Sequence, residues 1–169
     1  FYDEDGETVL DTQTVDYGTA ATYGGEAPSK EATAQYTYAF TDWYTAKEWG
    51  TVDNLSNVTA NRSVYARYSA TVNQYNVTFV DEDGTTVLKA ATAYDYGTLA
   101  ADIVKPADPT KAATQQYTYS FAWWTPSVAN VTADATYRAT YNSTVNQYTI
   151  TFYDEDGETV LDTQTVDYG

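Results

Sequence analysis

The stretch FYDEDGETVLDTQTVDYG occupies residues 1–18 and recurs letter for letter at residues 152–169. A diverged copy, FVDEDGTTVLKAATAYDYG, occupies residues 79–97 of this 169-residue chain. A sequence that returns after so long an interval is typical of tandem modules, each of which forms one structural unit. We therefore expect a first repeat at residues 1–72 that lacks the start of its first strand, a second repeat at 73–145, and the opening hairpin of a third at 146–169.

Alternating apolar and polar residues predict the first hairpin of each repeat. Tyr75, Val77 and Phe79 alternate with polar residues and would lie on one face of a strand. The DEDG segment at 81–84 supplies the Asp and Gly residues that hairpin turns favour. A returning strand is expected at 85–94, where the second repeat has one residue more than the first. We expect a β-bulge to absorb this extra residue.

The second half of each repeat is predicted to contain a short helix and a second hairpin. Residues 98–103 place Leu99 and Ile103 four residues apart, as on one face of a helix, and prolines follow. Strands are expected at 117–121 and 137–141. The predicted fold class is mainly β (α+β), with tandem small modules of ββ(short α)ββ order arranged as a rod.

Composition excludes several classes of function. The chain has 24 Asp and Glu residues against 8 Lys and Arg residues, so it would repel a partner that offers phosphate groups. It has no His and no Cys, and therefore lacks the usual catalytic nucleophile pairs and the commonest ligands for zinc, copper and haem. No apolar run reaches the roughly 18 residues that span a bilayer. We expect no enzyme activity, no cofactor, no nucleic acid partner and no membrane insertion in this segment.

Both repeats carry the same series of motifs, F-x-D-E-D-G, D-Y-G, P-x-K, Y-x-F-x-x-W and V-T-A-x-x-x-x-x-A-x-Y. The series runs from Phe1 to Tyr68 and again from Phe79 to Tyr141. It resembles the Listeria–Bacteroides repeat, the B-repeat type of internalins and other bacterial surface proteins. The resemblance implies a β-grasp-like module, used in tandem between a ligand-binding head and the cell wall, with neighbouring repeats of the same array as its partners. It implies an extracellular location at the bacterial cell surface and no catalytic residues.

Each repeat departs from the family pattern at one position. Asp42 and Trp123 stand where Gly is common before the last Trp of the fourth motif. We expect the backbone at these positions to bend differently from the family pattern.

The acidic DEDG loops resemble the opening of a calcium-binding loop. The twelfth residue counted from Asp81 is Thr92, and from Asp3 it is Thr14, so the bidentate Glu of such loops is missing. Paired carboxylates could also serve a glycosidase, but on the tip of a turn they would not flank a cleft. We interpret the loops as solvated acidic turns and expect no metal site.

The aromatic residues raise the possibility of a glycan-binding site. Those at 36–40 and 117–121 recur at strand spacing in both repeats, as a core or sheet-face ladder would. Trp49 differs, because it lies in the longer 44–57 segment of the first repeat and has no counterpart in the second. Trp49 and Tyr44 are therefore the candidate ligand contacts, for a glycan or a host surface protein.

Two kinds of covalent modification are left open by the sequence. Lys89 or Lys111 could form an intramolecular amide with an Asn or Asp side chain, a reaction that needs a buried lysine beside its partner. Six Asn-x-Ser/Thr triplets occur, and in a chain so rich in Thr we interpret them as a result of composition.

The predicted function is a non-catalytic structural spacer in the stalk of a secreted bacterial surface protein or adhesin. Residues 69–74 connect the last strand of the first repeat to the first strand of the second and contain no Gly or Pro, so we do not expect a flexible link. The alternatives are adhesive repeats that bind glycans or host proteins, and repeats of a self-assembling extracellular fibre. We also expect these residues to be part of a longer array.

Overall fold

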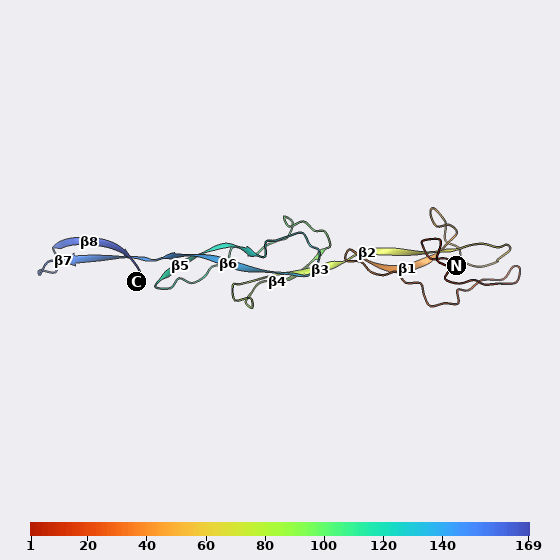
Figure 1. Ribbon diagram of the computed structural model, residues 1–169, viewed down its shortest axis with the longest axis horizontal. Helices are drawn as coiled ribbons and strands as arrows, with labels where there is room; N and C mark the ends of the chain where they lie inside the picture. Colours follow the sequence, from red (N-terminus) through yellow and green to blue (C-terminus); the bar gives the residue numbers. More distant parts are fainter. The chain divides into compact units, whose positions relative to one another are not determined.

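Eight strands and no helix make up the chain in the computed structural model, which describes all residues from Phe1 to Gly169 (Figure 1). The chain divides into two compact units, Phe1–Asn73 and Gln74–Gly169. The predicted mainly β class is confirmed. No segment forms a helix of the length and apolar character that a membrane crossing requires.

A four-stranded mixed sheet forms the body of unit two. Its strands lie in the order β4-β3-β6-β5, with β3 antiparallel to β4, β5 antiparallel to β6, and β3 parallel to β6. Two hairpins are thus joined side by side through their central strands, in the predicted ββ…ββ order. The bounds are β3 Gln74–Val80, β4 Val87–Asp95, β5 Tyr117–Thr125 and β6 Ala135–Val145.

The predicted short helix at residues 98–103 is wrong. The segment forms a turn in which the Asp102 N–H donates to the Leu99 carbonyl at 2.9 Å. So short a segment cannot recover the cost of helix nucleation from hydrogen bonds of its own. Of the apolar pair on which the helix was predicted, Ile103 is buried in the core of unit two, whereas Leu99 is 54% exposed.

Aromatic and aliphatic side chains from the central strands form the core of unit two. Phe79 is completely buried, and its ring meets Trp124 edge-on at 4.9 Å between centroids. On β5, alternate side chains including Tyr119 and Phe121 are half-buried, which confirms the predicted sheet-face ladder. The buried residues are Val77, Phe79, Ile103, Trp124, Val131, Tyr137 and Ala139.

The predicted bulge in the first hairpin is confirmed. Val77 pairs with Thr92 and Phe79 with Lys89, so an additional residue of β4 is accommodated between these two pairs. The same hairpin has another register shift between Phe79 and Val80. On β5, a register shift occurs after Phe121, next to Trp123. The equivalent shift in unit one lies next to Asp42, and neither residue has a positive φ, so these bends do not require the Gly that the family commonly has.

Unit one has only two full strands, β1 (Tyr36–Tyr44) and β2 (Tyr65–Val72), which pair in antiparallel fashion. Its opening segment forms single bridges, Tyr2 with Val9 and Tyr2 with Tyr65, in place of a hairpin and a parallel strand pair. The core is correspondingly smaller, with Trp43, Val64 and Ala66 buried.

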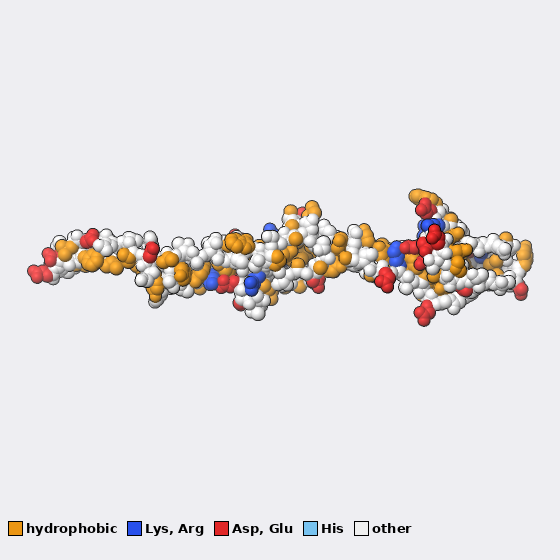
Figure 2. Space-filling view, in the orientation of Figure 1, with side chains coloured by type: hydrophobic (Ala, Val, Ile, Leu, Met, Phe, Trp, Pro, Cys, Tyr) orange, Lys and Arg blue, Asp and Glu red, His pale blue; other side chains and the backbone are white.

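The last two strands, β7 (Gln147–Tyr153) and β8 (Val160–Asp167), form a separate antiparallel hairpin within unit two. Figure 2 shows hydrophobic side chains along this hairpin, and Tyr148, Ile150 and Phe152 are all exposed. The sequence of β7 alternates as that of β3 does, but no second sheet layer or neighbouring strand covers it.

Candidate functional site

A cluster of charged and aromatic side chains ties the acidic turn of unit two to the sheet. The Lys111 ammonium lies 2.5 Å from a Glu82 carboxylate oxygen and 4.2 Å from the centroid of the Tyr119 ring. The Tyr141 hydroxyl donates to Asp81 at 2.7 Å. The loop before β5, the turn after β3 and the face of the sheet therefore meet at one point. We call this cluster the turn clamp.

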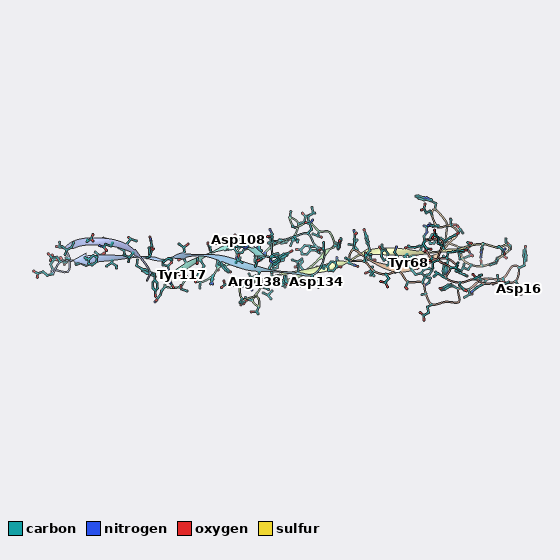
Figure 3. All side chains as sticks on the ribbon, viewed as in Figure 1. Asp16, Tyr68, Asp108, Tyr117, Asp134 and Arg138 are labelled. Atoms are coloured by element: carbon teal, nitrogen blue, oxygen red, sulfur yellow. The ribbon has the colours of Figure 1, made fainter.

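Unit one repeats the turn clamp with the equivalent residues. Lys30 pairs with Glu4 at 2.5 Å and lies over the Tyr38 ring at 4.3 Å. The Tyr68 hydroxyl donates to Asp3 at 2.9 Å, and Figure 3 labels this tyrosine. The same geometry in two diverged sequences indicates a structural requirement of the repeat.

The clamp changes the acidity of its members. Burial, together with the hydrogen bond to Asp81 and the charge of Asp81, raises the pKa of Tyr141 to about 12. The hydrogen bond and charge of Glu82 raise the pKa of Lys111 above its ordinary value. Tyr141 thus stays a hydrogen-bond donor and Lys111 stays a cation, so the cluster is suited to holding structure and not to proton transfer.

The two lysines considered for an intramolecular amide lie in different surroundings. The Lys111 side chain is 32% exposed and pairs with Glu82. Lys89 donates to the carbonyl of Val104 and to the hydroxyl of Tyr94. Neither lysine has the buried position beside an Asn or Asp that the reaction needs.

The acidic turns use their carboxylates to build the turn itself. Asp83 accepts hydrogen bonds from the backbone N–H groups of Thr85 and Thr86, both at 2.7 Å, and from the Thr86 hydroxyl at 2.6 Å. These bonds lower the pKa of Asp83 to about 2. Gly84 follows with a φ of +75°, a conformation that side chains disfavour. The turns are hydrogen-bonded acidic loops, and no group of three or more acidic side chains in them is placed to hold a metal ion.

A single asparagine links repeat two to the next hairpin. β6 ends and β7 begins on either side of Asn146. Its side-chain amide donates to the carbonyls of Thr114 and Gln115 at 2.8 and 3.0 Å, and its side-chain oxygen accepts from the Thr118 hydroxyl at 2.7 Å. The side chain thus closes the loop before β5.

The backbone of Asn146 is held from both sides. Its N–H donates to Gln116 at 2.8 Å, and its carbonyl accepts from the N–H of Tyr168, at the end of the next hairpin, at 2.9 Å. The Tyr148 hydroxyl adds a bond to the carbonyl of Gln115 at 2.5 Å. The hairpin is therefore attached to repeat two by hydrogen bonds as well as by the chain.

Asn73 makes the same contacts in unit one. Its amide donates to Thr33 and Ala34 at 2.8 and 3.1 Å, its side-chain oxygen accepts from Thr37 at 2.7 Å, and its N–H donates to Gln35 at 2.9 Å. We call Asn73 and Asn146 the junction asparagines.

The 44–57 segment contains both candidate ligand contacts. Trp49 is 96% exposed and has a φ of +59°. Tyr44 is half-buried, with the Arg67 guanidinium 4.4 Å above its ring, so one ring face is covered. Trp49, Leu55 and Asn57 are the three non-glycine residues of the chain with positive φ, and all lie in this segment.

Sequence reasoning did not identify the junction asparagines or the role of Lys30. The available signal was recurrence, because Thr-Val-Asn-Gln-Tyr stands at 71–75 and again at 144–148, while the surrounding residues differ. Asp53 was also missed: it is buried, and it pairs with Arg62 at 3.3 Å and accepts from the Leu55 N–H at 2.8 Å.

Comparison with known proteins agrees with the motif series. Residues 1–67 match the family model of the Listeria-Bacteroides repeat domain. Among solved structures, the chain is similar to "Streptococcal High Identity Repeats in Tandem (SHIRT) domains 3-4 from cell surface protein", with 18% sequence identity, a TM-score of 0.34, and coverage of 82% of this chain and 86% of that chain. A similarity this low carries no argument about function. No curated protein matches the chain. The family match confirms, over residues 1–67, the resemblance to the Listeria-Bacteroides repeat drawn from the motifs.

Proposed function

We propose that the chain is a non-catalytic spacer, a run of repeats that sets a distance at the bacterial cell surface. The observation that carries the proposal is the one-residue junction: β2 passes to β3 through Asn73, and β6 passes to β7 through Asn146. A junction of one hydrogen-bonded residue has little of the freedom of a flexible linker. The match of residues 1–67 to the Listeria-Bacteroides repeat model supports a surface repeat and a non-catalytic role.

Each repeat, in this proposal, is a β-grasp-like module in which a turn replaces the helix. The repeats occupy residues 1–72 and 73–145, and 146–169 opens a third. With strand residues rising about 3.3 Å each, a strand of the length of β3 spans roughly 23 Å, and successive modules add their lengths to a rod. The protein would be secreted and would belong to the stalk of an adhesin, with neighbouring repeats as its main partners.

Spin labels can test the proposal in the full chain, which has no native Cys. Labels are attached to cysteines introduced at Glu26 and Lys105, which are both exposed and lie one in each unit. A spacer is expected to give a narrow distribution of distances between the labels. Asn73→Gly should broaden that distribution, because it removes the side chain that holds the junction.

The matched control is Asn61→Gly, which changes an exposed asparagine away from the junction and should leave the distribution narrow. A broad distribution in the unsubstituted chain, or equal widths for the two variants, would show that the junction does not hold the modules and would end the spacer proposal.

A second candidate function is adhesion through Trp49. Its indole is almost fully exposed. Its backbone has a positive φ, a conformation that L residues rarely adopt, and backbone strain of this kind is found at ligand sites. An exposed aromatic face can stack on a sugar ring, and Tyr44 lies at the base of the same segment. Binding to a glycan array that is lost in Trp49→Ala, but kept in the exposed-residue control Trp123→Ala, would support adhesion; no binding by the unsubstituted chain would exclude it.

A further inference from the structure

The loop at residues 45–51 stands on a short antiparallel stem that continues from β1. The Thr45 N–H donates to the Thr51 carbonyl at 2.9 Å, and the Asp53 N–H donates to the Trp43 carbonyl at 2.8 Å. Trp43 and Asp53 are both buried. The base of the stem is therefore held in the core of unit one, although the loop itself extends from the surface.

The tip of this loop contains a glycine that no other residue can replace without a shift of the backbone. A Cβ atom on Gly50 would lie 2.5 Å from the nitrogen of Ala46 and 2.9 Å from its carbonyl oxygen. Trp49, directly before this glycine, has a φ of +59°. The close backbone approach at Gly50 and the left-handed conformation of Trp49 together define one shape of the tip.

The Arg67 side chain fastens the loop to the sheet. Its guanidinium donates to the Lys47 carbonyl at 3.3 Å and lies 4.4 Å from the centroid of the Tyr44 ring. Arg67 belongs to β2, and Tyr44 is the last residue of β1. Because a planar guanidinium can stack on a ring while its N–H groups donate, one side chain connects both strands to the loop.

The surroundings of the Trp49 indole fit a sugar better than a protein partner. Trp49 and Val52 are the exposed large apolar side chains of the 44–57 segment, at 96% and 50% exposure. An aromatic anchor of a protein interface lies within a packed, desolvated patch, which two separate side chains do not provide. A pyranose ring needs less, because one apolar C–H face can stack on one indole while its hydroxyls stay in water.

The charges near the loop favour a neutral sugar over an acidic one. The two cations of this region are engaged by the fold: Arg67 stacks on Tyr44, and the Lys47 side chain packs against the acidic turn, next to Gly6. Glu48 is exposed beside the indole, and the chain has a net charge of −16. A sugar that carries carboxylate or sulfate groups would therefore be repelled.

We propose that residues 45–51 form a preorganised loop that presents Trp49 to neutral, β-linked pyranose chains, with Gly50 and Arg67 as its positioning residues. This inference rests on the second candidate function, adhesion through Trp49, and adds to it the class of sugar and the residues that hold the indole in place. A loop that is already ordered loses little conformational freedom when it binds, so its rigidity contributes to affinity.

Titration with two hexasaccharides tests the class of sugar. The neutral probe is a β-linked hexamer of glucose, and the acidic probe is a β-linked hexamer of mannuronate. Binding is followed through the indole N–H resonance of Trp49, which is identified by its absence from the spectrum of Trp49→Phe. The neutral hexamer should shift this resonance and the acidic hexamer should not. Equal shifts from the two probes, or no shift from the neutral hexamer, would overturn the inference.

Two variants test the positioning residues. Gly50→Ala and Arg67→Ala should each weaken binding of the neutral hexamer by about tenfold, because the ligand must then also order the loop. Relaxation of the Trp49 indole N–H should show greater mobility in both variants, while the buried Trp43 indole stays unchanged. The control is Gly24→Ala, where a Cβ atom would meet only side-chain atoms, at 3.5 Å, and affinity should be kept.

The outcomes separate this inference from adhesion itself. If no glycan binds, or if Trp49→Ala binds as well as the unsubstituted chain, adhesion through Trp49 fails and this inference fails with it. If binding needs Trp49 but Gly50→Ala and Arg67→Ala keep full affinity and a rigid indole, adhesion stands and the positioning roles are wrong.

Discussion

Phe79 and Phe152 hold the same position in two copies of the repeat but lie in different surroundings. Phe79 is completely buried between β4 and β6, whereas Phe152 is 46% exposed on the last hairpin. We expect Phe79→Ala to lower the free energy of unfolding of unit two by about 3–5 kcal/mol, as for other buried aromatic residues. Chemical denaturation followed by tryptophan fluorescence measures this change.

Phe152→Ala is the matched control for that measurement. A surface substitution of this kind should alter the free energy of unfolding by roughly 0.5 kcal/mol or less. Similar losses for the two variants would mean that the last hairpin is packed as tightly as β3, contrary to its exposure in the structure.

Tyr141 predicts a dependence of stability on alkaline pH. Its pKa in the fold is raised from 10.0 to about 12, mainly by burial and by the hydrogen bond to Asp81. A raised pKa means that the neutral phenol stabilises the fold fully below pH 10, and that this contribution is lost as the pH rises from 10 to about 12. Thermal melts of the unsubstituted chain should therefore fall across that range.

Tyr141→Phe separates this effect from general alkaline unfolding. The variant lacks the titrating hydroxyl, so its melting temperature should be lower at neutral pH and should change less between pH 10 and 12. The difference in tyrosinate absorbance between the two proteins reports the midpoint of Tyr141 directly. A midpoint near 10 would show that the bond to Asp81 does not form in solution.

For single residues, the sequence predicted which side chains are buried better than it predicted which side chains contact one another. Val77 and Phe79 were placed correctly, because apolar residues at strand spacing must face a core. The bond from Tyr141 to Asp81 joins residues 60 apart in the chain. No local pattern encodes such a contact, which becomes visible only after the strands have been assembled.

Among the elements, the link between β6 and β7 has the most direct consequence for function. Asn146→Ala removes three side-chain hydrogen bonds, to Thr114, Gln115 and Thr118. We expect the β7–β8 hairpin to move more freely relative to β6, and its backbone NMR order parameters to fall while those of β3–β6 stay unchanged. Asn142→Ala, at an exposed position of β6, is the control and should leave the hairpin unaffected. Equal order parameters in both variants would show that the Asn146 side chain does not hold the hairpin in place.

The strands were predictable and the helix was not, for a physical reason. In strands such as β3 and β6, apolar and polar residues alternate because one face is buried, and this period of two can be recognised in the sequence. The 98–103 segment has one apolar pair at helical spacing, which is equally compatible with a turn that buries Ile103 alone. The small number of full strands in unit one was also beyond sequence reasoning, since its motif series matches that of unit two.

For the whole molecule, the acidic turns lead to a prediction about metal ions. The carboxylate oxygens of Asp83 already accept three hydrogen bonds from Thr85 and Thr86, and Asp156 is held in the same way in the last hairpin. We expect the melting temperature to be the same in EDTA and in millimolar calcium. Magnesium at equal ionic strength is the control for screening of the net charge of −16. A specific rise with calcium would show that the turns rearrange to bind it.

The parallel pair at the centre of unit two also determines how a module would respond to tension. The chain enters at the start of β3 and leaves at the end of β6, and these neighbours run in the same direction. Pulling on the two ends therefore drags β3 backward and β6 forward, so that their hydrogen bonds are loaded together in shear. A hairpin such as β3–β4 pulled at its open end would instead unzip one bond at a time. A module with this connection should therefore resist unfolding when its two ends are pulled apart.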